Sequence, residues 1–200
     1  MSRVRTRPSR DDTRGKLFRA AADLFERRGI GGTTIDAITA AADLTRGAFY
    51  SNFAGKDELV IAMLEDHAER SRAFHRAAIA RHDTPADLIA ALRTADRDDD
   101  PLGRSPLLHI ELILYVARCE RRRPELAERL RARRRLIAEL VSATLGDAAD
   151  VDADSAGALL VALEDGFRLH WLIDPATTPA DSFFPAVAWL ERLVRTHSGR

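Results

Sequence analysis

Apolar residues recur along this chain at the spacing of helices rather than of strands. Alanine, leucine and arginine dominate, and nowhere do β-branched residues alternate with polar ones for long. Leu17, Leu24 and Phe25 repeat at helical spacing within one segment, which the glycines from Gly29 onward bring to an end. The pattern predicts an all-α fold of about nine helices.

Prolines, small polar residues and glycines divide the pattern into separate helices. Pro85 and Pro106 stand at positions where helices begin, and Gly146 lies near the end of another helix. The acidic stretch ADRDDDPLGRSP, residues 95–106, is predicted to be a solvated connection. In chain order, the predicted helices begin near Asp12, Thr34, Thr45, Lys56, Pro85, Pro106, Pro124, Asp154 and Pro179.

The second and third of these helices have the dimensions of a helix-turn-helix. We interpret Thr33 as the N-cap of the second helix, with Asp36 closing an acidic version of the capping box. Thr45 is predicted to cap the third helix. Helices of about nine and eight residues, joined by a turn of about three or four, suit a protein that reads the major groove of DNA.

Three aromatic rings lie close together in the third helix, within the stretch LTRGAFYSNF, residues 44–53. Phe49 and Phe53 are four positions apart and are predicted to face the protein core, whereas Tyr50 turns its hydroxyl outward. Arg46 stands in the first turn, which meets base edges when such a helix enters a groove. Gly47 has no side chain and permits a close approach to the duplex.

Composition and charge fit a globular protein with a basic amino-terminal end. The chain has 200 residues, is 46% apolar and has no net charge, which argues against a uniformly basic nucleic-acid coat. The stretch MSRVRTRPSR holds four arginines and no acid, and is predicted to be a disordered arm. Whether it enters a minor groove is left open. Cys119 is the single cysteine, so no internal disulfide forms.

No feature of the sequence directs the chain to a membrane. No apolar run reaches the length of about 18 residues that a membrane-spanning helix needs, and the first ten residues lack the apolar core of a signal peptide. We therefore expect a cytoplasmic protein. The sequence also lacks the spaced cysteines and histidines of a metal cage, and we expect neither a metal nor a cofactor.

From Leu24 to Leu59 the chain reads LFERRGIGGTTIDAITAAADLTRGAFYSNFAGKDEL. This stretch resembles the TetR (tetracycline-repressor-like) family of transcriptional regulators nearly continuously. The remainder resembles the family in its number of helices and in the stretch LEDGFRLHWLIDP. The resemblance implies a helix-turn-helix DNA-binding domain with a basic arm in residues 1–56, and a helical effector-binding and dimerisation domain in residues 57–200.

The same resemblance implies a function and a set of DNA contacts. The protein is expected to be a ligand-responsive regulator, and most often a repressor that a small-molecule effector releases from palindromic double-stranded operator DNA. Residues at positions 51 and 52 are often bulkier in the family, so the operator sequence is not inherited. The expected DNA-binding residues are Thr34, Thr45, Arg46, Gly47, Tyr50, Ser51, Asn52 and Lys56.

The last two predicted helices are apolar on more than one side, which favours a homodimer. Two such helices from each subunit would form a four-helix bundle, as in the family. The expected dimer residues are Leu159, Leu163, Phe167, Trp171, Phe184, Val187, Leu190 and Val194. Candidate effector contacts are Phe74, His109, Glu111, Tyr115, Phe167 and His170. Each of these six also has a simpler interpretation, as core packing or as a locally satisfied polar group.

Two other classes of function remain as alternatives. An all-helical enzyme would use His109 with Glu111, or Glu164 and Asp165 with His170, for acid–base or metal chemistry. The spacing of His109 and Glu111 is that of the H-x-E motif of zinc deaminases, but the paired cysteines of that motif are missing. A dimeric scaffold that binds no DNA is the third reading, and salt-dependent duplex binding would argue against it.

Overall fold

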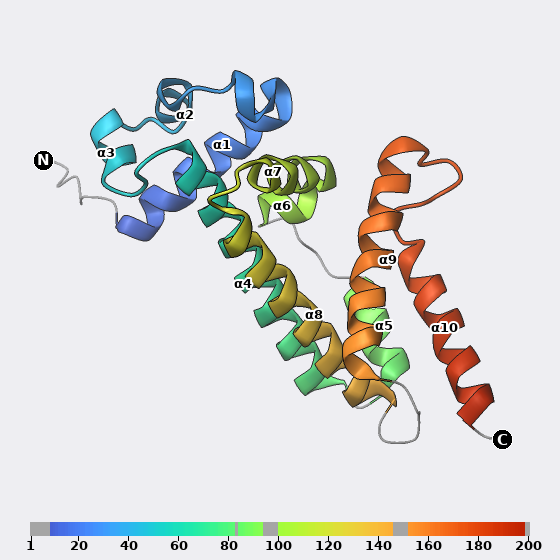
Figure 1. Ribbon diagram of the computed structural model, residues 1–200. Coiled ribbons are helices and arrows are strands. Elements are labelled where there is room, and N and C mark those ends of the chain that lie inside the picture. Colours follow the sequence, from blue (N-terminus) through green and yellow to red (C-terminus); the bar gives the residue numbers. More distant parts are fainter. Residues whose placement is uncertain (1–8, 83, 94–99, 146–151, 199–200) are drawn as a thin grey trace, which may run out of the picture. The chain divides into compact units, whose positions relative to one another are not determined.

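The computed structural model describes residues 9–82, 84–93, 100–145 and 152–198 (Figure 1). All regular secondary structure in these ranges is helical, which confirms the predicted fold class. None of the helices described is long and apolar enough to cross a bilayer. The helices are α1 (Arg10–Gly32), α2 (Ile35–Ala41), α3 (Arg46–Tyr50), α4 (Lys56–Arg81), α5 (Pro85–Arg93), α6 (Pro101–Arg104), α7 (Pro106–Arg118), α8 (Arg123–Leu145), α9 (Ala153–Ile173) and α10 (Phe183–Ser198).

The structure has one helix more than the number predicted. This helix is α6, a single turn inside the stretch that was expected to be a solvated connection. Asp100 caps it, because its Oδ1 accepts the N–H of Leu102 at 3.1 Å. Residues 95–99 of that connection lie outside the described residues, as do Gly146 and residues 1–8 of the basic arm.

One predicted helix cap and one predicted helix start are wrong. The N-cap of α2 is Thr34, whose Oγ1 accepts the N–H of Ala37 at 3.2 Å, so Asp36 does not close a capping box with Thr33. Thr33 is buried instead, and its hydroxyl donates to the carbonyl oxygens of Gly29 and Leu24 at 2.9 and 3.3 Å. The last helix begins at Phe183 rather than near Pro179, because turns occupy the residues before it.

The described residues form two units, and the first is built on the amino-terminal helices. It contains α1, α2 and α3, the start of α4 up to His67, and α6 with α7, both of which pack against α1. Apolar side chains from all of these helices fill its core. The most deeply buried of them include Leu17, Phe25, Ile30, Ile38, Phe49, Phe53, Leu59, Val60, Leu102, Leu108 and Leu112.

The second unit contains α4 from Ala68 onward, α5, and α8 to α10. One of its apolar clusters joins α4, α5 and α8 through Ala78, Leu88 and Leu140. The backbones of α8 and α9 approach closely at Gly157, where an added Cβ would lie 2.7 Å from the carbonyl oxygen of Arg134. Only glycine permits this approach.

Candidate nucleic-acid interface

Helices α2 and α3 are capped in the same way and joined by a tight turn. Thr45 Oγ1 accepts the N–H of Ala48 at 3.1 Å, as Thr34 does for α2, and this confirms the predicted cap of α3. Between the helices Asp43 has φ 54°, a left-handed conformation that aspartate tolerates better than most residues. The Leu44 N–H then donates to the Thr39 carbonyl oxygen at 2.9 Å, which turns the chain into α3.

Aromatic packing holds α3 in a single orientation. Phe49 and Phe53 are fully buried, with ring centroids 5.7 Å apart, and the Phe53 ring stacks on Phe18 of α1 at 5.8 Å. Tyr50 lies on the other side of the helix and is 49% exposed. The inward and outward rings are therefore as predicted. The Arg14 guanidinium, which the sequence analysis did not single out, lies 4.9 Å from the Phe53 ring centroid.

Arg46 is the first residue of α3, and two neighbours position its guanidinium. Its Nε lies 3.1 Å from Oδ1 of Asp36 in the first turn of α2, and its Cζ lies 6.0 Å from the Tyr50 ring centroid. The hydrogen bond with the Tyr50 side chain, and then the Asp36 carboxylate, raise the pKa of Arg46 above its ordinary value. The first turns of α2 and α3 thus lie side by side. The role of Asp36 was missed because its partner is ten residues away.

The other residues expected around α3 divide into exposed and buried ones. A Cβ on Gly47 would meet only Thr45 Oγ1, at 3.7 Å, so packing inside the protein does not require glycine there. Ser51 is exposed and donates its hydroxyl to the Ala48 carbonyl oxygen at 3.0 Å. Asn52 is 8% exposed and its amide donates to the same oxygen at 2.8 Å. A buried side chain of this kind holds the end of α3 and is not placed to meet DNA.

Lys56 lies at the start of α4 and binds the end of α1. Its Nζ donates to the carbonyl oxygens of Ile30 and Thr33 at 2.7 and 3.0 Å. These oxygens follow a break in α1 at Gly29, where φ is 70° and ψ is 162°. The ammonium group therefore supports the segment that leads into α2, and of its three donors one is left for a phosphate.

Three of the predicted effector contacts lie on α7, and the structure gives each a neighbour inside the first unit. Glu111 Oε1 accepts the Ile30 N–H at 3.0 Å, beside the break in α1. The Tyr115 hydroxyl donates to Asp57 Oδ1 at 2.7 Å, and burial and that carboxylate raise the pKa of Tyr115 to about 12. The buried His109 ring packs 4.6 Å from the ring of His67.

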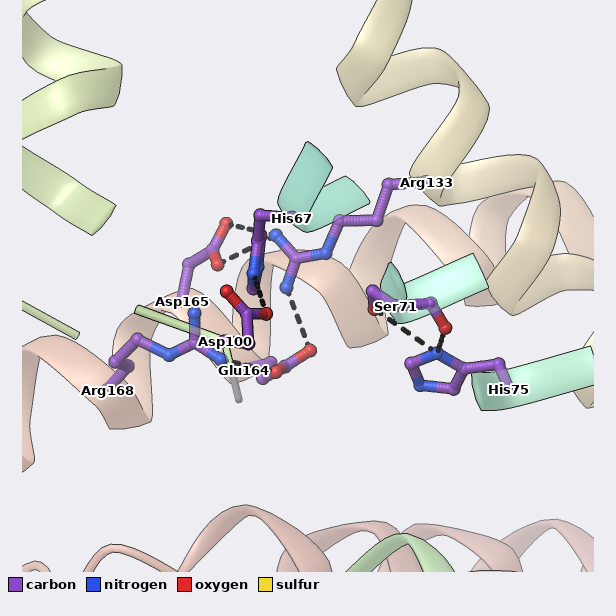
Figure 2. A network of polar contacts seen from close by, with 8 residues as sticks. All are labelled: His67, Ser71, His75, Asp100, Arg133, Glu164, Asp165 and Arg168. Atoms are coloured by element: carbon purple, nitrogen blue, oxygen red, sulfur yellow. Dashed lines mark hydrogen bonds and ion pairs between the residues drawn. The ribbon is translucent and has the colours of Figure 1, made fainter. Parts of the chain in front are cut away.

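His67 also has a charged partner. Its Nδ1 lies 2.6 Å from Oδ2 of Asp100, a contact that Figure 2 shows. Together with the bonds of α7, this pair joins α4 and the residues before α6 within the first unit. The ring of His109 and the polar groups of Glu111 and Tyr115 therefore hold α7 against α1 and α4, and we do not retain these three residues as effector contacts.

The carboxylates considered for an enzyme belong to an ion-pair cluster in the second unit. Arg133 of α8 binds Glu164 at 2.8 Å and Asp165 at 2.9 Å, and Arg168 binds Glu164 at 2.8 Å (Figure 2). His170 lies on the exposed part of α9. Over the ranges that the structure describes, no group of three or more potential ligand side chains is arranged to hold a metal.

Helices α9 and α10 expose apolar side chains in rows. On α9 the row alternates steps of three and four residues, the spacing of a helix–helix seam. We call it the α9 seam, and it consists of Leu159, Ala162, Gly166, Leu169 and Ile173. Leu159 and Ile173 are 57% and 72% exposed, and Trp189 and Leu193 of α10 are exposed as well. The other residues expected at the dimer interface are half-buried, namely Leu163, Phe167, Trp171, Phe184, Val187, Leu190 and Val194.

Comparison with known proteins agrees with this arrangement. Residues 17–63 match the family model for bacterial regulatory proteins of the tetR family, and residues 83–196 match that for the tetracyclin repressor-like C-terminal domain. The HTH-type transcriptional regulator TtgR of Pseudomonas putida is 28% identical over 194 residues, which cover 86% of this chain and 85% of that protein. The HTH-type transcriptional repressor Rv3405c of Mycobacterium tuberculosis is 34% identical over 125 residues, covering 62% of this chain and 60% of that one.

A solved structure extends the likeness to the whole chain. It is that of a proposed transcriptional regulator from Pseudomonas aeruginosa PAO1, with a TM-score of 0.71, 25% identity and coverage of 98% of both chains. The first family model spans most of α1, all of α2 and α3, and the start of α4. The second spans the helices from α5 to α9 and nearly all of α10. The chain therefore belongs to the TetR family of bacterial transcriptional regulators.

Proposed function

We propose that this regulator represses transcription by binding a near-palindromic operator as a homodimer, and that a small-molecule effector releases it. The observation that carries DNA recognition is the orientation of α3. Phe49 and Phe53 anchor one side in the core, while Arg46 and Tyr50 stand exposed on the other. Repression is supported by the Mycobacterium tuberculosis relative, which is a transcriptional repressor.

The proposed DNA contacts come from three neighbouring places in the first unit. The hydroxyls of Thr34 and Thr45 accept backbone N–H groups and keep a proton to donate to a phosphate. Arg46 and the open space at Gly47 face base edges, Tyr50 and Ser51 face the backbone, and Lys56 offers its remaining donor. Asn52 is left out because it is buried.

A second copy is required because one short recognition helix reads only a few base pairs. The α9 seam, with Trp189 and Leu193 of α10, is the proposed dimer surface, since an apolar row at this spacing packs against an equal row. A symmetric pair would place the two recognition helices about one helical turn of DNA apart, roughly 34–36 Å.

The effector is proposed to bind in the second unit, with Phe74, Phe167 and His170 as candidate contacts. α4 is continuous from Lys56 to Arg81, so an effector that shifts its later turns also acts on its first turn. A coupling free energy of about 1–3 kcal/mol would change operator affinity roughly 5- to 150-fold. Compounds that raise the melting temperature should then lower operator affinity, and the switching proposal fails if none of them does.

Selection of bound fragments from random DNA tests the proposed DNA contacts and the proposed dimer together. The full-length protein should enrich an inverted repeat with half-sites about one helical turn apart. A double variant carrying Arg46→Ala and Tyr50→Phe should lose at least about tenfold in affinity for the recovered sequence while keeping its circular dichroism spectrum. Arg131→Ala removes another exposed arginine, from α8, and serves as the control. Equal binding by both variants would refute the proposed contacts.

The dimer surface has its own matched pair of variants. Leu159→Glu puts a charge on the α9 seam, and Leu130→Glu puts the same charge on an exposed leucine of α8. Sedimentation should find the first as a monomer and the second as a dimer at the same concentration. A dimeric Leu159→Glu protein would move the interface elsewhere.

A further inference from the structure

The proposed DNA-reading surface of α2 and α3 contains an acidic residue, whose carboxylate would repel an approaching phosphate. Asp36 lies in the first turn of α2, where its carboxylate contacts the guanidinium of Arg46. Both side chains are nearly two-thirds exposed. Between Thr34 and Asn52 the charged residues are Asp36, Asp43 and Arg46, so this segment carries one more acid than base. Attraction to phosphate therefore does not explain how the segment binds DNA.

The geometry of the pair divides the donors of Arg46. Nε lies 3.1 Å from Asp36 Oδ1, and the Tyr50 ring centroid lies 6.0 Å from the guanidinium carbon. Apart from the hydrogen bond with the Tyr50 side chain, the donors of the two terminal nitrogens remain for a partner beyond the protein. Two parallel donors of this kind match O6 and N7 of guanine in the major groove, which is the commonest specific contact of arginine.

Stability alone is a weak reason for this pair. An exposed ion pair contributes about 0–1 kcal/mol, and long side chains lose rotamer freedom when they form it. An acid in the first turn of α2 is favourable for that helix, but the benefit does not need Arg46 as a partner. What the pair does accomplish is to fix the direction of the guanidinium and to cancel its charge toward phosphates.

We infer that Asp36 is a specificity-determining residue that holds Arg46 for guanine in each half-site and keeps it from binding phosphates at random. This inference rests on the proposed function, because it concerns the same DNA-reading surface. It assigns Asp36 a positioning role, since the residue acts through Arg46. Without the carboxylate, Arg46 keeps only Tyr50 as a neighbour, gains affinity for any duplex and loses its preference for one base.

The test compares two substitutions that remove the same charge. Asp36→Asn removes the charge at the pair, and Asp43→Asn removes it in the turn, where Asp43 is exposed and asparagine tolerates the positive φ. Fluorescence anisotropy on the full-length protein would measure affinity for the selected operator, for operators changed one base at a time, and for an unrelated duplex. Each titration is repeated over a range of salt concentrations.

We expect Asp36→Asn to lower the ratio of operator to unrelated affinity about tenfold, mainly by tightening binding to the unrelated duplex, and to flatten the penalty for replacing guanine. Asp43→Asn should raise both affinities alike and leave the ratio within about twofold. Asp36→Glu keeps the charge and should retain part of the guanine preference.

Two negative results are distinguishable. If Asp36→Asn behaves like Asp43→Asn, with the guanine penalty intact, Asp36 is a surface charge only and the inference is overturned. If the unaltered protein enriches no sequence from random DNA, the proposed function itself fails before Asp36 is tested. Circular dichroism melts of each variant show whether the comparison is made between folded proteins.

Discussion

The break in α1 at Gly29 allows a stability change to be worked out from the structure. Its φ of 70° and ψ of 162° belong to a region that residues with a Cβ occupy at a cost of about 1–3 kcal/mol. An alanine Cβ would also lie 3.3 Å from Glu111 Oε1, which must move and so weaken its bond to the Ile30 N–H. Hydrogen bonds to charged groups contribute about 1.5–3 kcal/mol, and part of that is lost. Gly29→Ala should therefore destabilise the first unit by about 2–4 kcal/mol.

Hydrogen exchange measured by mass spectrometry is the suitable assay. Trp171 and Trp189, the two tryptophans, both lie in the second unit, so fluorescence does not report on the first. Peptides from α1 to α3 should exchange about 30- to 1,000-fold faster in Gly29→Ala, which is the factor that corresponds to 2–4 kcal/mol. Peptides from α8 and α9 should be unchanged.

Gly31→Ala is the matched control. Nothing lies within 4 Å of a Cβ at Gly31, and alanine there should be neutral or stabilise α1 by up to about 1 kcal/mol. In a Glu111→Ala background the Gly29→Ala effect should shrink, because the carboxylate that the new Cβ would displace is already gone. Equal exchange in the Gly29 and Gly31 variants would refute the reasoning about the break.

Three other predictions concern single side chains. Lys56→Met removes the donor to the two carbonyl oxygens that follow the break at Gly29. Hydrogen exchange in α1 and α2 should become faster, by an amount that corresponds to a loss of about 1–3 kcal/mol in local stability, and operator affinity should also fall. Unchanged exchange would contradict these two hydrogen bonds. Because the native pKa of Tyr115 is raised to about 12, its stabilising contribution is complete below pH 10 and is lost as the pH rises toward 12. Absorbance titration of the Tyr50→Phe variant, in which Tyr115 is the remaining tyrosine, should show a midpoint near 12 and not near 10. Arg133→Met leaves Asp165 without its arginine partner and should lower the free energy of unfolding by about 1–3 kcal/mol. Arg131→Met, at an exposed ion pair, should lower it by less than about 1 kcal/mol. Urea melts followed by tryptophan fluorescence measure both.

The features of α3 that follow from local periodicity were predictable. Phe49 and Phe53 lie on the inner side because they are four residues apart, and Tyr50 lies outside because it is a third of a turn away. Asn52 was placed outside on resemblance alone, and its burial follows from the bend after α3, where its amide meets the Ala48 carbonyl oxygen.

The bonds that position α2 were not predictable because they join distant parts of the chain. Lys56 and Glu111 bind the end of α1 from 26 and 81 residues away along the sequence. Thr33 was predicted to cap α2, but its hydroxyl donates to the Gly29 carbonyl oxygen at the break in α1, and Thr34 caps the helix instead.

The exposed side of α9 was not predictable from the sequence, for a different reason. Nearly every turn of that helix is apolar, so periodicity does not indicate which side meets a neighbour. The close approach at Gly157 decides it, since this glycine turns one side of α9 toward α8 and leaves the α9 seam on another.

The composition of the first unit bears on how regulators of this kind can be recombined. Its core includes Leu108 and Leu112 of α7, and its polar bonds include Ser105 to Glu26 at 2.8 Å; Ser105, Leu108 and Leu112 all lie more than about 70 residues beyond the end of α1. A hybrid sensor made by grafting only the amino-terminal helices onto a foreign body would leave an apolar surface bare and the Ile30 N–H without its acceptor. Transplanting α6 and α7 together with α1 to α3 and the start of α4 up to His67 would carry the whole unit, and with it the proposed DNA-reading surface.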